Sequence, residues 1–339
     1  MGISKNQDQP SSQEKKVLLS VIIATYNGHD YIDRCLESFT RQSIESNVFE
    51  VIIVNNNSTD DTNQIVLKYV NQFDYYFLLE ENNPGVSYAR NKGIRHAKGK
   101  YICFIDDDAY ADENWLKNVL LAFQNISPKP AVVGGRILPY YTTKKPEWFY
   151  DFLEIRTKGN DAKFLSKSEC YSGFPESNYS VRKDVLEEVG YFSTDLGPKG
   201  EKMKFGEGSE LSRRIAEKYP YFWYDPDIFV YHLVRERNMS IRYYLSRIYK
   251  TGFLYQALRA PENNFFKNLF VLSSCIIRIL LNALLSIVFV RWFTKKAKSD
   301  WLKHTATMVS CIARGISIIK YYFNKNITMI LLFIWVGLS

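Results

Sequence analysis

The sequence predicts an α/β fold in which parallel strands alternate with crossover helices, a doubly wound domain. Two observations carry this prediction: apolar, strand-forming runs alternate with helix-like segments over residues 17–138, and the runs end in polar residues. Alternation at this spacing is typical of βαβ units, whose crossover connections make neighbouring strands parallel. The expected strands are Val17–Ala24, Glu50–Val54, Tyr75–Leu79, Tyr101–Ile105 and Ala131–Leu138. The expected helices are Asp30–Gln42, Asp60–Val70, Val86–Ala97 and Asn114–Ile126.

The most informative segment runs from Tyr101 to Asp108, where five strand-forming residues lead into three carboxylates. A buried strand here would end at Asp106, Asp107 and Asp108, on the edge where open α/β sheets bind ligands. Three adjacent like charges repel one another, so the segment indicates a bound cation or a metal–polyphosphate complex. An acidic turn that caps the next helix is the structural alternative, and the surrounding sequence disfavours it.

Polar segments follow the other predicted strands in the same way. The first strand ends in Thr25-Tyr26-Asn27, and the second ends in Asn55-Asn56-Asn57-Ser58-Thr59-Asp60. A turn at Pro84-Gly85, a helix start and an Arg90-Asn91 pair then lie one strand before the three aspartates. Because carboxyl ends of parallel strands share one edge of a sheet, these segments are expected to meet.

Together these separated elements, in this order, resemble the family 2 glycosyltransferases over residues 17–237. The resemblance implies a GT-A fold, a Rossmann-like nucleotide-diphospho-sugar transferase domain, and inverting transfer of a sugar to an acceptor hydroxyl. It identifies Asp106-Asp107-Asp108 with the family's Asp-x-Asp motif, so that Asp108 binds a metal and Asp106 contacts the metal or the ribose. A histidine near the metal or diphosphate is implied at His232. Hard oxygen ligands suit Mg²⁺ or Mn²⁺, which would stabilise a departing diphosphate.

The resemblance also implies a nucleotide site made by the loops after the first two strands and by the helix that carries Arg90. In the second loop, asparagines stand where the family usually has an aspartate that contacts uracil. Because an amide both donates and accepts hydrogen bonds, base binding is retained while uridine specificity is left open. Arg90 is a planar, permanently charged donor that suits a diphosphate. The residues expected to bind the donor are Thr25, Tyr26, Asn27, Asn55, Asn57, Arg90, Asp106 and Asp107.

A general base is expected from a second carboxylate across the donor pocket. Glu207 stands at the position of the family's Glu-Asp motif, but the second acid of that motif is Gly208 in this sequence. Glu207 is therefore the preferred catalytic base, and Glu210 is the alternative. Both acids also suit the first turn of a helix, where they favour the macrodipole.

The chain is expected to divide into a leader, a catalytic domain and a basic C-terminal region. Residues 1–16 are polar without an apolar run, which indicates a disordered leader rather than a signal peptide. Residues 17–239 form the expected GT-A domain, in which 17–138 bind the nucleotide sugar and 139–239 bind the acceptor. The aromatic stretch 140–175 lacks periodicity and is typical of a binding loop.

Residues 240–339 are expected to form a helical, membrane-associated region. Between Ser240 and Lys325 there are 14 Lys/Arg and 2 acidic residues, or +12, whereas the remaining 30 basic and 34 acidic residues sum to −4. Leu269–Val290 holds 15 Leu, Ile, Val and Phe residues, interrupted by Arg278 and Asn282. A full span would export the basic residues that follow, against the positive-inside tendency, because the nucleotide sugar requires a cytosolic catalytic domain.

Helices that lie in the membrane interface, at the cytoplasmic face of the cell membrane, accommodate both the apolar run and the basic residues. A helical subdomain with its own core is the alternative. No nucleic-acid motif interleaves the basic residues, so the expected partners are a nucleotide-sugar donor, a glycan or lipid-linked acceptor and a membrane surface, as in polysaccharide or glycolipid synthesis. The five cysteines form no Cys-x-x-Cys pair, which argues against a disulfide framework or a zinc site.

Two other functions fit parts of the sequence. A sugar nucleotidyltransferase also combines an α/β sheet with acidic metal ligands, but it requires a glycine-rich, basic phosphate loop after the first strand, which Thr25–His29 lacks. A catalytically silent scaffold of an envelope-polysaccharide assembly complex is compatible with the lost acid at Gly208 and with the asparagine run.

Overall fold

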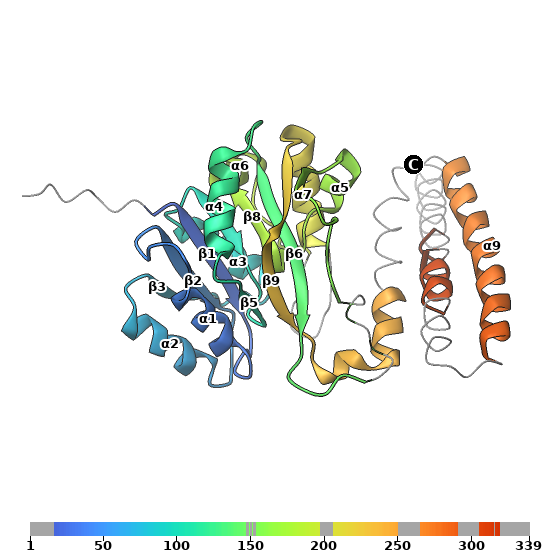
Figure 1. Cartoon of the computed structure of the whole chain (residues 1–339), viewed down its shortest axis with the longest axis horizontal. Coiled ribbons are helices and arrows are strands. Elements are labelled where there is room, and N and C mark those ends of the chain that lie inside the picture. Colours follow the sequence, from blue (N-terminus) through green and yellow to red (C-terminus); the bar gives the residue numbers. More distant parts are fainter. Residues whose placement is uncertain are drawn as a thin grey trace, which may run out of the picture. The chain divides into compact units, whose positions relative to one another are not determined.

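The computed structural model describes residues 17–146, 149, 151, 154–196, 206–249, 265–290, 305–314 and 316–318 (Figure 1). They belong to two compact units, the first drawn from residues 1–140 and 154–233 and the second from 141–153 and 234–339. The expected leader, residues 1–16, lies outside the described residues, as do 250–264, 291–304 and 319–339 of the expected C-terminal region.

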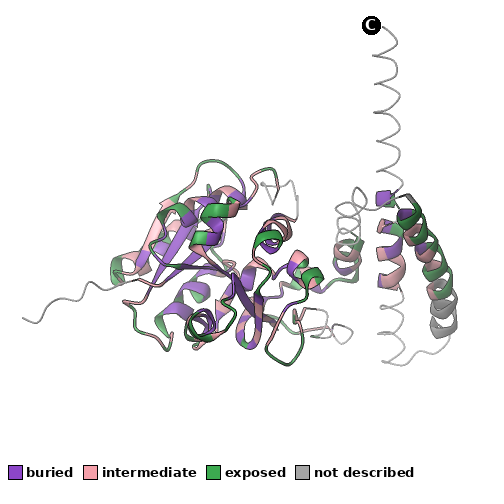
Figure 2. Ribbon diagram, turned by 90° about the horizontal axis from the view of Figure 1, so that it is seen from above, coloured by how far each residue is buried: buried purple, intermediate pink, exposed green. Residues whose placement is uncertain are grey.

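The described part of the first unit is built on one nine-stranded sheet. Its strands are β1 Leu19–Thr25, β2 Phe49–Asn55, β3 Tyr76–Glu80, β4 Tyr101–Phe104, β5 Ala109–Ala111, β6 Val132–Tyr140, β7 Lys163–Phe164, β8 Tyr179–Arg182 and β9 Phe222–Leu233. The order across the sheet is β3-β2-β1-β4-β8-β6-β9-β5, and β7 pairs with β9 beside this path. In Figure 2 the strands are purple along most of their length, because side chains cover both faces of the sheet.

Helices cover both faces. One face carries α1 Ile32–Thr40, α2 Thr62–Gln72 and α4 Trp115–Asn125, whose apolar residues form one core with the sheet. The opposite face carries α3 Val86–His96, α5 Lys167–Ser172, α6 Lys183–Val189 and α7 Glu207–Lys218, which form a second core. Such a three-layer arrangement buries strands on both sides, as their continuous apolar runs predict.

All five strands and four helices predicted over residues 17–138 are present, and their ends differ from the prediction by at most two residues. The prediction that these five strands run parallel is correct, since β1 to β4 pair in parallel and β6 has the same direction on the far side of β8. Two strands that were not predicted run in the opposite direction. Strand β8 runs antiparallel to both β4 and β6, and β5 runs antiparallel to β9. Because a buried antiparallel strand has the same apolar run as a parallel one, periodicity does not reveal direction.

Strand β5 was not predicted at all. It begins five residues after β4 ends, too few for the crossover that a parallel neighbour requires, and the chain instead reaches β9. The aperiodic stretch 140–175 also contains regular structure, since α5 starts at a capping box formed by Ser166 and Glu169.

The topology brings the ends of four strands to one edge. Strands β1, β2 and β4 are parallel neighbours, so Thr25, Asn55 and Asp106 end or follow them at the same edge. Strand β8 is antiparallel to both β4 and β6, so β6 has the same direction as β4. Strand β9 is parallel to β6 and therefore ends at the same edge as β4. His232 near the end of β9 therefore lies on that edge too.

The second unit has a small core of its own, formed by Phe149, Val234, Met239, Tyr244 and Ala306. Its described helices are the 3-10 helix η3 Glu236–Met239, a helix over residues 241–249, α9 Phe265–Val290 and helical segments over residues 305–314 and 316–318. The apolar residues Phe266, Phe270 and Leu280 of α9 are 77%, 72% and 65% exposed, and green is the main colour of the part of α9 whose burial Figure 2 shows. Within the described ranges, no helix combines the length and apolarity needed to cross a membrane.

Candidate active site

Asp106, Asp108 and His232 form a cluster that could hold a metal ion. One ligand atom from each lies within 4.8 Å of the others. His232 Nε2 lies 3.2 Å from Asp108 Oδ1 and 3.8 Å from Asp106 Oδ2. The other ring nitrogen, Nδ1, lies 3.2 Å from the backbone oxygen of Leu233. Because a carbonyl oxygen can only accept, Nδ1 carries a proton, and Nε2 faces the carboxylates. Two carboxylates and an imidazole are a donor set that suits Mn²⁺ or Mg²⁺.

The charges in this cluster shift the pKa values of its members in opposite directions. Burial alone would raise the pKa of Asp106, but a hydrogen bond from His232 and the charges of Arg90 and His232 hold it below its ordinary value. Burial also opposes the charged form of His232, yet the hydrogen bond to Asp106 and the charges of both aspartates raise the pKa of the imidazole to about 9. The two carboxylates thus favour a positive charge at the imidazole, and a bound cation would supply that charge in place of a proton.

Arg90 links this cluster to a second one. Its side chain is 7% exposed, and its Nη2 donates to Asp106 Oδ1 at 3.1 Å while its Nη1 donates to Glu207 Oε1 at 3.3 Å. Glu207 is the first residue of α7 and is buried. One guanidinium thus joins the strand end that carries Asp106 to the helix start that carries Glu207.

Two residues of this second cluster were missed by the sequence analysis. Glu176 and Ser177 belong to η2 Glu176–Asn178, a 3-10 helix immediately before β8, and the Ser177 hydroxyl donates to Asp106 Oδ2. Burial, opposed by the charge of Arg90 and reinforced by that of Glu207, raises the pKa of Glu176 to about 7. No local pattern marks them, since their relation to Asp106 depends on the pairing of β8 with β4.

Glu210, the alternative base, is engaged elsewhere. Its Oε1 and Oε2 accept from Arg214 Nε at 2.6 Å and Nη2 at 2.9 Å, one turn along α7. The same guanidinium donates to the backbone oxygens of Val189, Gly190 and Tyr191. Glu210 and Arg214 thus fasten α7 to the end of α6.

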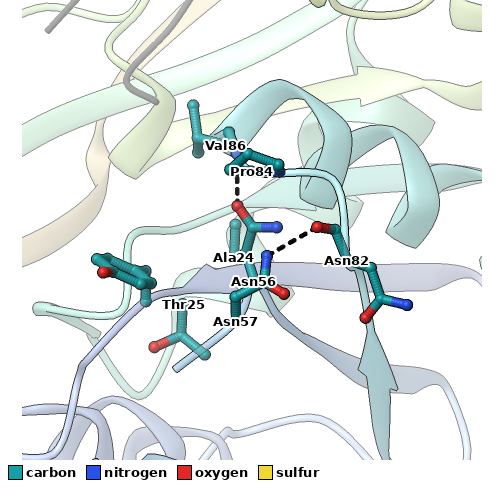
Figure 3. Close-up of a pocket in the computed structure, with 9 residues that line it drawn as sticks. Ala24, Thr25, Asn56, Asn57, Asn82, Pro84 and Val86 are labelled. Atoms are coloured by element: carbon teal, nitrogen blue, oxygen red, sulfur yellow. Dashed lines mark hydrogen bonds between the residues drawn. The ribbon is translucent and has the colours of Figure 1, made fainter. Parts of the chain in front are cut away.

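A pocket of about 450 Å³ opens at the carboxyl ends of β1 and β2 (Figure 3). Among the predicted donor-binding residues, Thr25, Tyr26 and Asn57 line it. Asn27 and Asn55 instead hold the loops behind it, accepting hydrogen bonds from the backbone of Thr59 at 2.8 Å and Ser58 at 3.0 Å. The other lining residues are Ala24, Asn56, Asn82, Pro84, Gly85 and Val86.

Asn56 and Asn57 form one wall of this pocket (Figure 3). The amide of Asn56 donates to the backbone oxygens of Glu81 and Asn83 and accepts from the backbone of Gly85 at 2.7 Å. Asn57, at a φ of 67°, donates to the backbone oxygen of Asn82 at 3.0 Å. Asn56 therefore fixes the turn before α3 with both ends of its amide, and the pocket wall is held in place before any ligand binds.

Asp107 connects the pocket to the cluster of Asp106, Asp108 and His232. Its Oδ2 accepts from Thr25 Oγ1 at 2.6 Å, and Thr25 lines the pocket. Gly28 packs against this pair, since a Cβ on Gly28 would meet Thr25 Oγ1 at 2.6 Å and Asp107 Oδ2 at 2.9 Å. Asp107 thus binds the loop after β1, while Asp106 and Asp108 lie beside His232.

The chain is similar to glycosyltransferases in both sequence and structure. It is 28% identical over 202 residues to a glucosyl-dolichyl phosphate glucuronosyltransferase of Haloferax volcanii, covering 59% of this chain and 64% of that protein. It is 39% identical over 189 residues to the poly(ribitol-phosphate) beta-N-acetylglucosaminyltransferase TarS of Staphylococcus aureus, covering 52% and 33%. The chain thus spans less than two thirds of the length of these curated relatives.

Solved structures share the fold. The mannosyltransferase PcManGT from Pyrobaculum calidifontis, in complex with GDP-Man and Mn²⁺, superposes with a TM-score of 0.58 at 18% identity, covering 92% of this chain and 91% of that one. TarS 1-349 in complex with UDP-GlcNAc gives 0.54 at 19% identity, covering 91% and 92%. The model of the family described as "Glycosyl transferase family 2" matches residues 20–190, half of the chain. The mixed α/β sheet is therefore GT-A-like, and the chain belongs to glycosyl transferase family 2.

Proposed function

We propose that the protein transfers a sugar from a nucleoside diphosphate donor to an acceptor hydroxyl in a single, inverting, cation-dependent displacement. The observation that carries this proposal is the meeting of three features at one sheet edge: a pocket, a cluster of metal-ligand type and a group of carboxylates around Arg90. Family membership supports the reaction class. The solved neighbours carry UDP-GlcNAc and GDP-Man, so their likeness supports a nucleotide-sugar donor without selecting its base.

The donor nucleotide fits the pocket beside Thr25 and Tyr26. The Tyr26 side chain is 53% exposed and lines the pocket, so its ring offers a surface on which a base can stack. From there the hydrogen bond between Thr25 and Asp107 leads to the cluster of Asp106, Asp108 and His232. A donor with its base at Tyr26 would thus direct its diphosphate toward that cluster.

A divalent cation, Mg²⁺ or Mn²⁺, would be held by Asp106, Asp108 and His232, and when bound it would neutralise charge that develops on the departing diphosphate. Arg90 and Ser177 hydrogen-bond to Asp106 and so fix the orientation of this carboxylate. The bound Mn²⁺ in the PcManGT structure supports the assignment of the cation.

The acceptor hydroxyl must lose a proton as its oxygen bonds to the anomeric carbon. A carboxylate of the Arg90 group accepts that proton in our proposal, and the diphosphate leaves from the opposite side. Of the two bases predicted from the sequence, Glu207 belongs to this group, whereas the carboxylate of Glu210 is bound by Arg214. Because the displacement occurs in one step, the configuration at the anomeric carbon inverts.

The stereochemistry of the product tests this mechanism. With an α-linked donor, ¹H NMR of the first product formed should show a β anomer, identified by its large coupling between the first two ring protons. Spectra must be recorded before mutarotation wherever the acceptor is water. An α-linked first product would contradict a single displacement and would require an enzyme-bound sugar intermediate.

We further propose that the acceptor is a glycan or lipid-linked molecule and that the second unit associates with the cytoplasmic face of a membrane. The relative from Haloferax volcanii is described as acting on a glucosyl-dolichyl phosphate, which supports this class of acceptor. The exposed apolar residues of α9, together with the +12 charge of residues 240–325, support attachment to an anionic surface.

Attachment should therefore depend on salt. Each basic residue near an anionic surface contributes about 1 kcal/mol, and 1 M salt shortens the screening length to about 3 Å. In flotation assays with anionic vesicles, 1 M NaCl should release a large fraction of the protein. Phe266→Ser combined with Phe270→Ser should release more, since it removes two exposed rings from α9. Release by detergent alone, with a tag after Ser339 accessible from outside the cell, would contradict peripheral attachment.

A further inference from the structure

Glycine 208 leaves room for a carboxylate that comes from another element. Gly208 lies in the first turn of α7, directly after Glu207, and both residues are buried. A Cβ built on Gly208 would lie 1.5 Å from Glu176 Oε1 and 2.4 Å from Glu176 Cδ. Any side chain at position 208 would therefore displace the carboxylate of Glu176. The sequence has no acid at position 208, and the carboxylate of Glu176, from η2, occupies the space that a side chain at that position would fill.

The element that carries Glu176 is rigidly anchored. Asn178, two residues on, donates through Nδ2 to the backbone oxygens of Arg136 and Ile228 at 2.8 Å, and its Oδ1 accepts from Trp115 Nε1 at 2.9 Å. Ser177 is bound to Asp106. A group held this way keeps its position without cost during the reaction, which a catalytic base requires.

Glu176 and Glu207 differ in how they meet Arg90. Glu207 forms a direct ion pair with the guanidinium at 3.3 Å, and its side chain is 10% exposed. For Glu176, burial raises the pKa and the charge of Arg90 lowers it, while the charges of Glu207 and Asp106 raise it further. These three groups, from α3, α7 and the end of β4, are the charged residues that act on it. Glu207 is thus the direct ion-pair partner of Arg90, while Glu176, with a pKa of about 7, is able to receive a proton near neutral pH.

We propose that Glu176 is the general base of the transfer reaction and that Glu207 is a positioning residue that holds Arg90. This inference rests on the proposed function. The Glu176 carboxylate takes the proton of the acceptor hydroxyl as the acceptor oxygen bonds to the anomeric carbon. The bond between that carbon and the diphosphate breaks, and the diphosphate leaves with the electron pair.

Paired substitutions in the full-length protein separate the two glutamates. The assay follows release of nucleoside diphosphate from a panel of UDP- and GDP-sugars with Mn²⁺, water serving as acceptor. Glu176→Gln should lower kcat by about 10²–10⁴-fold with little change in donor KM, the range for a lost general base. Glu207→Gln should lower kcat less. It should also move the acidic limb of the kcat profile to lower pH, because the charge of Glu207 raises the pKa of Glu176.

A double substitution tests the spatial claim. Gly208→Asp alone should lower activity, since its Cβ collides with Glu176. Glu176→Ala alone should be inactive. The double variant Glu176→Ala/Gly208→Asp removes the collision, restores a carboxylate to the same space and should exceed Glu176→Ala in kcat by about tenfold or more. Circular dichroism and thermal unfolding confirm that each variant is folded.

The outcomes distinguish the two levels of the proposal. A wild-type protein that turns over none of the panel contradicts the proposed function and this inference with it. If the wild type is active and Glu176→Gln keeps the same kcat, the assignment of Glu176 is wrong while the proposed function stands. The same holds if Glu207→Gln lowers kcat more than Glu176→Gln does. A folded double variant no more active than Glu176→Ala contradicts the claim that a carboxylate in this space is what the reaction requires.

Discussion

Arg90→Met should destabilise the protein by about 3–5 kcal/mol, the cost of removing one partner from a buried ion pair. Met matches the length of the arginine side chain without its charge, so the change leaves Asp106 and Glu207 without their shared cation. Urea unfolding measures the loss. Arg95→Met is the matched control, because Arg95 is an exposed residue of the same helix and should cost less than about 1 kcal/mol.

The loss at Arg90 should also depend on pH. In the wild type, the charge of Arg90 lowers the pKa of both Asp106 and Glu176. Without the guanidinium, these two carboxylates therefore bind protons more readily in the folded state. The folded variant then binds more protons than the folded wild type, so its stability relative to the wild type falls as pH rises. The deficit against wild type should be larger at pH 8 than at pH 5.5. An equal deficit at both pH values, or none at either, would contradict the role of Arg90 as the shared counter-ion.

Asp108→Asn should lower cation-dependent turnover of the nucleotide sugar by about 10²–10³-fold while leaving the fold intact. Asparagine preserves the volume of the side chain but removes a charge and a ligand from the cluster with Asp106 and His232. The apparent affinity for Mn²⁺, measured from the dependence of rate on its concentration, should fall with it.

Asp227→Asn is the matched control for this prediction. Asp227 lies on β9, the strand that carries His232, but its side chain is 80% exposed. It should retain wild-type turnover and wild-type dependence on Mn²⁺. Full activity of Asp108→Asn in the presence of EDTA would exclude the assigned metal role.

The sequence was sufficient for the elements and for the edge at which they meet. Continuous apolar runs such as Tyr101–Ile105 are long enough to identify buried strands, and the acids that follow must then lie at a strand end. The common direction of the five predicted strands was predictable from their alternation with helices. The direction of β8 was not, because its run reads the same whether it is parallel or antiparallel to β4. Strand β5, with three residues, is too short for any periodicity.

The site was predictable only where its residues follow strands. Asp106, Asp108 and His232 were named from their positions after β4 and near the end of β9, and the structure brings them together. Arg90 contacts two carboxylates, which depends on how α7 packs against the sheet, and its expected contact with a diphosphate stays a prediction. Glu176 was missed because its relation to Gly208 joins residues that are distant in sequence and meet only through packing.

The most direct test of the account is the turnover of nucleoside diphosphate sugars by the wild-type protein, with Mn²⁺ and with EDTA. The account predicts that at least one donor is broken down to a nucleoside diphosphate with Mn²⁺ or Mg²⁺, that EDTA abolishes this reaction, and that added cation restores it. Such a result also excludes a catalytically silent scaffold. Absence of turnover for every donor, or turnover that EDTA leaves unchanged, would contradict a cation-dependent glycosyltransferase.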